Sequence, residues 1–178
     1  MLMRKIRFTF VAAMSLFSIL LFSAVAFAAT DFTQFGFPKV IAEKKIEAGE
    51  AAKISHSGIK IDIPKGTFSN DVIFQVLEGE NSSFQANAPE GETVIMNFAF
   101  RVLDSKTNEI ITKFNNQVMF SFKNKNVNEG SIYYNVKPDG SIAKNSVPAE
   151  IEGRTLTHAI GATPVGWLIT SPTNSVKK

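Results

Sequence analysis

The amino-acid sequence predicts an all-β protein, a single antiparallel β-sandwich of immunoglobulin-like size that follows an N-terminal signal peptide. Three observations favour this fold class. Apolar and polar residues alternate along most of residues 29–178, as they do in strands that bury one face. Turn-forming residues separate these stretches at regular spacing. No helical periodicity of useful length occurs after residue 28.

The first 28 residues have the pattern of a cleavable secretory signal. A basic start precedes an apolar run over 8–22, and small residues follow that run at alternate positions. This pattern predicts cleavage before Ala29, with cleavage after Ala26 as the alternative. An uncleaved anchor is the other interpretation, but the run is near the short limit for a bilayer span. We therefore expect residues 29–178 to act outside the cytoplasm, secreted or at the cell envelope, with no membrane span after cleavage.

Charge and cysteine content exclude several classes of protein. The chain has 19 Lys and Arg against 16 Asp and Glu, and the three excess basic residues are Arg4, Lys5 and Arg7. Residues 29–178 are therefore balanced in charge, which argues against nucleic-acid binding. The sequence contains no cysteine, which excludes disulfides, thiolate zinc sites, a cysteine nucleophile and an acylated N-terminal cysteine.

Alternation of apolar and polar residues predicts about eight or nine short strands, each ended by residues that favour turns. The clearest covers 94–102, where every second residue is large and apolar. Residues 78–92 are predicted to form a long surface loop, and the Lys-Pro-Asp-Gly sequence at 137–140 is a strong turn signal. The predicted strands are 59–63, 71–79, 94–102, 118–122, 132–136, one that begins at Ile142, 149–151, 155–160 and 166–170.

Three phenylalanines, Phe32, Phe35 and Phe37, crowd the start of the expected domain. An exposed aromatic segment here could dock on a partner, for example by adding a strand to the edge of the partner's sheet. The alternative, which we favour, is that these rings cover the protein's own core.

A second aromatic set could bind a polysaccharide. Trp167, with Tyr133 and Tyr134, could form a flat surface that stacks on sugar rings. We favour a buried Trp167, because apolar residues follow it directly in the predicted strand. Successive side chains of a strand point to opposite faces. Ile132 and Tyr134 are expected to face inward, so Tyr133, which lies between them, is expected to be exposed.

The candidates for catalysis and metal binding are few. A small extracellular hydrolase would use His158 with a nearby serine and acid, although a histidine of the core or its rim is the favoured interpretation. The only other histidine is His56, and two isolated histidines are too few for a transition-metal site. Acidic residues beside the 78–92 segment could converge on calcium, but no Asp-rich spacing supports this. We expect no catalytic residues, no metal and no cofactor.

Two local patterns resemble a known family of domains. Residues 57–68 contain a Gly, a strand, Ile63-Pro64 and a second Gly, and the later stretch contains Tyr133-Tyr134, a Pro-Asp-Gly turn and residues 152–158. This resembles the β-sandwich module of ankyrins, netrin receptors and zonula-occludens proteins, as found in bacterial surface and envelope proteins. Ala159 and Ile160 follow His158 where the bacterial pattern has an aromatic and Ser.

The resemblance covers about a third of the expected mature chain and implies a non-catalytic interaction or structural module. The sequence thus predicts a signal peptide over 1–28 and one β-sandwich domain over 29–178. We expect a secreted or envelope-associated binding module whose partner is an envelope protein or a polysaccharide. A hydrolase using His158 is the alternative from another class.

Overall fold

The computed structural model describes residues 31–145 and 148–175. The predicted signal peptide lies outside the described residues. None of the helices in the described residues is long and apolar enough to cross a membrane.

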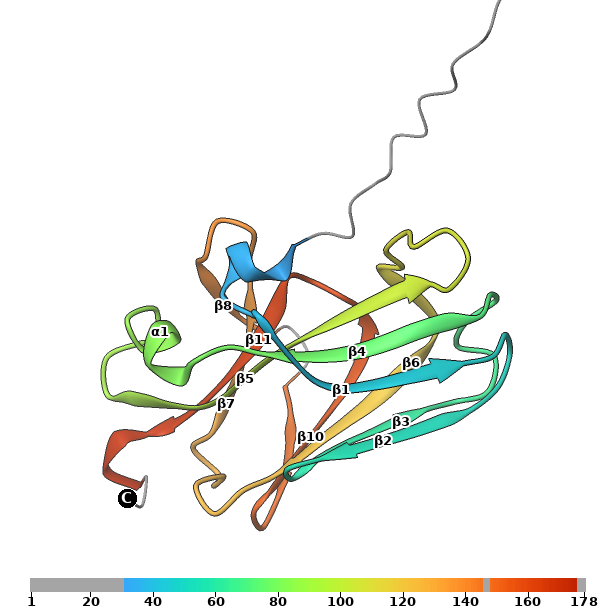
Figure 1. The fold of residues 1–178 in the computed structure, drawn as a ribbon. Helices are drawn as coiled ribbons and strands as arrows, with labels where there is room; N and C mark the ends of the chain where they lie inside the picture. The colour runs from blue at the N-terminus through green and yellow to red at the C-terminus, as the bar shows by residue number, and fades with distance from the viewer. Residues whose placement is uncertain (1–30, 146–147, 176–178) are drawn as a thin grey trace, which may run out of the picture.

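The described chain forms two antiparallel β-sheets that pack against each other (Figure 1), which confirms the predicted all-β sandwich. The six-stranded sheet has the strand order β1-β4-β5-β11-β7-β8, and the five-stranded sheet has the order β2-β3-β6-β10-β9. The strands are β1 (Lys39–Ile46), β2 (Ala52–His56), β3 (Ile59–Ile63), β4 (Val72–Glu78), β5 (Glu92–Asp104), β6 (Lys113–Lys123), β7 (Ile132–Val136), β8 (Ile142–Lys144), β9 (Glu150–Glu152), β10 (Thr155–Ala162) and β11 (Gly166–Pro172).

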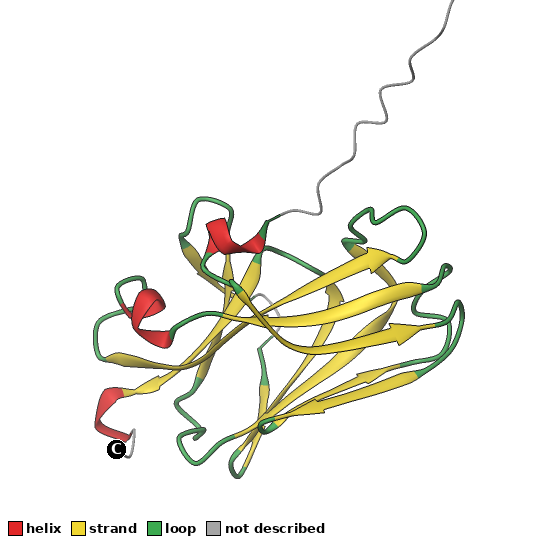
Figure 2. Ribbon diagram, viewed as in Figure 1, coloured by secondary structure: helices red, strands yellow, loops and turns green. Residues whose placement is uncertain are grey.

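Helices are short in the described part of the chain (Figure 2). They are the 3-10 turns η1 (Phe32–Phe35) and η2 (Thr173–Ser175) and the α-helix α1 (Asn81–Gln85). The α1 helix corrects part of the predicted long surface loop over 78–92, because residues 81–85 are helical and Phe84 is buried against the sheet. Five residues are too few to produce a helical period in the sequence.

The core between the two sheets is built around stacked aromatic rings. Phe98 on β5 stacks on Phe120 of the other sheet with ring centroids 4.1 Å apart, and on Trp167 of β11 at 5.0 Å. Phe100 meets the same Trp167 ring at 4.9 Å. Offset and edge-on aromatic pairs of this kind add to the free energy gained by burial. These contacts join the central strands of both sheets.

A second apolar cluster covers the outer face of the six-stranded sheet. Leu77, Ala99 and Leu168 project from β4, β5 and β11 into this cluster, and Phe37 and Phe84 pack over them. The central strands of this sheet are therefore buried on both faces, whereas the alternating burial of β3 and β10 is that of strands with one buried face.

Three of the four sheet edges, β1, β8 and β9, disfavour pairing with another strand; the fourth edge is β2. The edge strand β1 carries Lys39, Lys44 and Lys45, and its register with β4 shifts between Val40 and Ala42. The edge strands β8 and β9 have three residues each. Lysines, bulges and short length are the devices that protect sheet edges from association. Strand addition by a partner is therefore disfavoured at β1, β8 and β9.

Candidate functional site

The N-terminal segment lies against the outer face of the six-stranded sheet because two glycines leave room for it. The Gly79 backbone is so close to Gly36 that a Cβ added to Gly79 would lie 1.8 Å from the Gly36 carbonyl oxygen. A Cβ on Gly166 would lie 2.4 Å from the Phe37 ring. Asp31 begins the segment by accepting a hydrogen bond from the backbone N–H of Thr33 at 2.9 Å, which caps η1.

Buried polar contacts hold the same region from the sheet side. Asn97 of β5 is fully buried and its side-chain oxygen accepts a hydrogen bond from the Gly79 N–H at 2.7 Å. Its amide donates to the Gly79 carbonyl at 2.9 Å and to the side chain of Asn81 at 2.7 Å. The Asn97 side chain thus satisfies the backbone just beyond the end of β4. The hydrogen bond from Asn97 to Asn81 fixes the start of α1. The Phe84 ring of this helix packs on Phe37 with centroids 4.9 Å apart.

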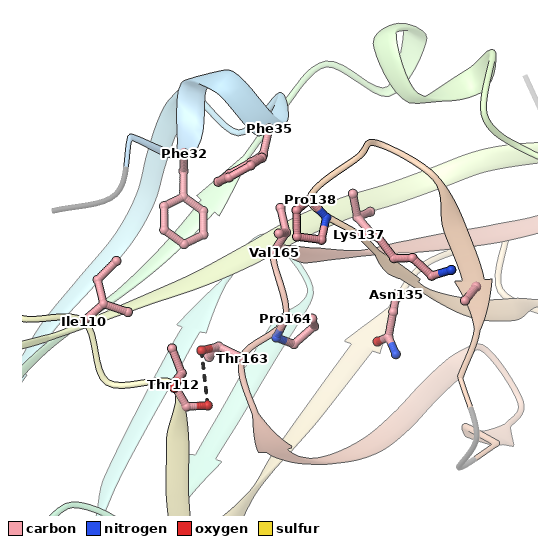
Figure 3. Close-up of a pocket in the computed structure, with 12 residues that line it drawn as sticks. Phe32, Phe35, Ile110, Thr112, Asn135, Lys137, Pro138, Thr163, Pro164 and Val165 are labelled. Atoms are coloured by element: carbon pink, nitrogen blue, oxygen red, sulfur yellow. Dashed lines mark hydrogen bonds between the residues drawn. The ribbon is translucent and has the colours of Figure 1, made fainter.

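An apolar groove of about 440 Å³ lies where this N-terminal segment meets the end of the sandwich (Figure 3). Phe35 comes from η1, Pro138 from the turn between β7 and β8, and Ile110 from the segment between β5 and β6. Pro164 and Val165 come from the connection between β10 and β11. Four segments that are far apart in the sequence therefore form one groove.

Backbone groups beside the groove are already hydrogen-bonded within the protein. The Thr163 N–H donates to the Thr112 carbonyl at 2.9 Å, and the Lys137 N–H donates to the Ser141 carbonyl at 2.9 Å. Pro138 and Pro164 have no N–H to offer. Lys137 is the one charged side chain among the described residues that line the groove. The arrangement suits an apolar group better than a polar one.

The three N-terminal phenylalanines have different environments. Phe32 and Phe37 are buried in the outer-face cluster, so these two rings cover the protein's own core. Phe35 is half-buried, touches Phe32 edge-on with centroids 6.0 Å apart, and lines the groove. The segment is a 3-10 turn held on its own sheet rather than a free aromatic strand.

The other predicted aromatic site is not at the surface. Tyr133 is 3% exposed and Trp167 is 2% exposed, and both belong to the core between the sheets. The prediction that Tyr133 faces solvent is wrong, because Ile132, Tyr134 and Val136 face the covered outer side of the sheet while Tyr133 faces the inter-sheet core. Neither ring can form an exposed surface for stacking on sugars.

Tyr134 is held by a carboxylate on the outer side of the sheet. Its hydroxyl donates to the Glu92 carboxylate at 2.9 Å, and Thr170 of β11 also donates to this carboxylate. Burial, followed by the hydrogen bond to Glu92, raises the pKa of Tyr134 to about 12. This cluster joins β5, β11 and β7 and keeps Tyr134 a neutral structural donor.

His158 lies in the core, in register with Phe120 on the neighbouring strand. Its ring packs on Tyr133 with centroids 4.3 Å apart. The buried Nδ1 of His158 and the hydroxyl of Tyr133 have no hydrogen-bond partner among the described residues. Within 31–145 and 148–175, no acid therefore makes the hydrogen bond to Nδ1 that would orient a catalytic histidine.

The stability of the protein is expected to fall as the pH drops from about 7 to about 5 through His158. Burial lowers the pKa of folded His158 below its ordinary value of 6.5, so below this pH the unfolded chain binds more protons than the folded one. The free energy of unfolding is thus greatest above about pH 6.5 and declines below it. Urea unfolding at several pH values measures this dependence.

The matched variants are His158→Phe, which removes the buried titrating ring, and His56→Gln, which changes an exposed histidine. The decline between pH 7 and pH 5 is expected to flatten in the first variant and to persist in the second. An equal decline in both would contradict the assignment to His158.

No group of three or more His, Asp or Glu side chains in 31–145 and 148–175 is arranged to hold a metal ion. Asp104, which closes β5, accepts hydrogen bonds from the backbone N–H groups of Lys106 and Thr107 at 2.8 and 3.0 Å. These bonds hold its pKa below the ordinary value and use the carboxylate as a turn cap.

The groove residues beyond η1 were missed in the sequence. Pro138, Pro164 and Val165 lie in turns, where prolines are expected on conformational grounds, and Ile110 lies in a short connection. The sequence feature that could have indicated a groove was an apolar residue in each of several turns or connections. Only the fold shows that these turns meet at one end of the sandwich.

Fold and groove together define the class of this protein: a two-sheet antiparallel β-sandwich with an apolar groove at one end. Comparison with known proteins gives no match, either to a family model or, at a significant level, to a curated protein.

Proposed function

We propose that this protein is a secreted or envelope-associated, non-catalytic binding module and that the apolar groove is its contact site. The observation that carries the proposal is the groove itself, where apolar side chains from η1 and three connecting segments gather at the surface. Elsewhere in the described residues the large apolar side chains that are exposed are isolated ones, Val40 and Met119. A contiguous apolar surface is the usual mark of a binding site.

One feature of the sequence supports the extracytoplasmic part of the proposal: the first 28 residues have a secretory pattern. The resemblance to the β-sandwich modules of surface and envelope proteins also implies a non-catalytic role. We favour the groove over a polysaccharide surface, because Tyr133 and Trp167 are buried.

The proposal is tested by affinity capture with residues 29–178 from envelope fractions of the producing organism. Val165→Asp places a charge in the groove, and Met119→Asp places the same charge on an exposed position of β6 outside it. A partner of the groove should be retained by the wild type and by Met119→Asp and lost with Val165→Asp. Burying an unpaired charge against the partner is costly enough to abolish a moderate affinity.

Thermal unfolding of the three proteins is the control for folding. Retained protein and lipid are identified separately by mass spectrometry. Retention of the same partner by Val165→Asp would show that binding does not use the groove and would contradict the proposal.

A further inference from the structure

We propose that the groove binds one hydrocarbon chain that carries an anionic headgroup, as in a free fatty acid. This inference rests on the proposed function, since it names the ligand of the same groove. Three properties of the groove support it: the mostly apolar lining with backbone N–H groups that are already used, the volume and the position of Lys137.

The hydrogen bonds beside the groove favour a ligand whose body has no polar groups. The backbone N–H groups of Thr163 and Lys137 are used within the protein, and both prolines lack one. The side-chain oxygen of Asn135 accepts a hydrogen bond from Asn145 at 2.9 Å. A peptide or a sugar in this groove would lose the hydration of many polar groups and find few partners for them among the mostly apolar lining, which is unfavourable. A hydrocarbon chain has no such groups to satisfy.

The volume favours one chain. The groove measures about 440 Å³, near the lower end of the range of about 300–1,000 Å³ that is usual for ligand sites. Phe35, Pro138 and Val165, which come from three different segments, all line it (Figure 3). A single chain can contact all of these walls, whereas a lipid with two chains would leave much of its apolar surface outside.

Lys137 supplies a positive charge that complements an anionic headgroup. It is the charged residue of the groove lining, and it forms no ion pair within the described residues. Asp139 on the same turn interacts electrostatically with Lys137 but forms no ion pair with it, and it accepts hydrogen bonds from the N–H and hydroxyl of Ser141 at 2.9 and 2.7 Å. The Lys137 ammonium group is thus available to a carboxylate at the groove rim, while the chain lies among the apolar side chains.

The probe is dodecanoate, titrated calorimetrically below its micelle concentration into residues 29–178. We expect saturable binding of one molecule per chain. Decanoate, which is shorter by two methylene groups, should bind about tenfold more weakly. Val165→Asp should abolish binding. Lys137→Gln, an exposed substitution that leaves the fold intact, should weaken dodecanoate binding about two- to fivefold.

Dodecyltrimethylammonium has the same chain with a cationic headgroup, and its binding should not weaken in Lys137→Gln. Absence of saturable dodecanoate binding, or binding that does not depend on chain length or on Val165, would overturn the inference. Binding to vesicles of anionic phospholipid but not to dodecanoate would also overturn it, in favour of a bilayer surface. A groove-dependent protein partner without dodecanoate binding would overturn the inference and leave the proposed function standing.

Discussion

Replacing Phe37 with alanine is expected to lower the free energy of unfolding by about 3–5 kcal/mol, the usual cost of removing a fully buried phenylalanine ring. Phe37 is 0% exposed and lies between the Gly166 backbone and the Phe84 ring. Little can move into the space it leaves, because Gly166 has no side chain and Phe84 is fixed by the short helix α1. Urea unfolding at neutral pH measures the loss.

The same substitution should also disrupt the groove. Phe37 is separated from η1 by Gly36 alone, so its loss frees the segment that carries Phe35 to one wall of the groove. The matched control is Phe35→Ala, which removes a half-buried ring of the same kind and should cost clearly less stability. Equal losses in the two variants would contradict the view that Phe37 holds the N-terminal segment in place.

Phe98→Ala should produce a loss of comparable size, about 3–5 kcal/mol, for a different reason. This ring stacks on Phe120 at 4.1 Å and on Trp167 at 5.0 Å, so it joins the two sheets at their centre. Its removal leaves a cavity bordered by rings whose positions depend on one another. Denaturant unfolding and near-ultraviolet circular dichroism of Trp167 report the effect.

Met119→Ala is the control for Phe98→Ala, because Met119 lies on the outer face of the five-stranded sheet and is 42% exposed. Its free energy of unfolding should stay within about 0.5 kcal/mol of the wild type. A loss below about 1 kcal/mol in Phe98→Ala would show that the stacked rings do not form the centre of the core.

Strands with one buried face were the most predictable part of the fold. The isoleucines of β3 alternate with Lys60 and Asp62, and all of these isoleucines face the core. The strands β1 and β2 were not predicted. The edge strand β1 has a bulge and mostly exposed or half-buried residues, so its sequence lacks a regular alternation.

The environment of β7 could not be predicted from alternation alone. Both faces of this strand are buried, Tyr133 between the sheets and Tyr134 under the N-terminal segment. Alternation shows which residues share a face but cannot show that the second face is covered as well. The groove could not be predicted for a similar reason, since Val165 and Pro138 come together only when the sheets are assembled.

The most direct test of the central claim, that the groove is the binding site, is photo-cross-linking from two single positions. A photoreactive amino acid replaces Val165 in the groove in one protein and Met119 in another, and each is irradiated with envelope fractions. We expect a cross-linked partner or lipid from position 165 and none from position 119. Cross-linking from position 119 with none from position 165 would contradict it.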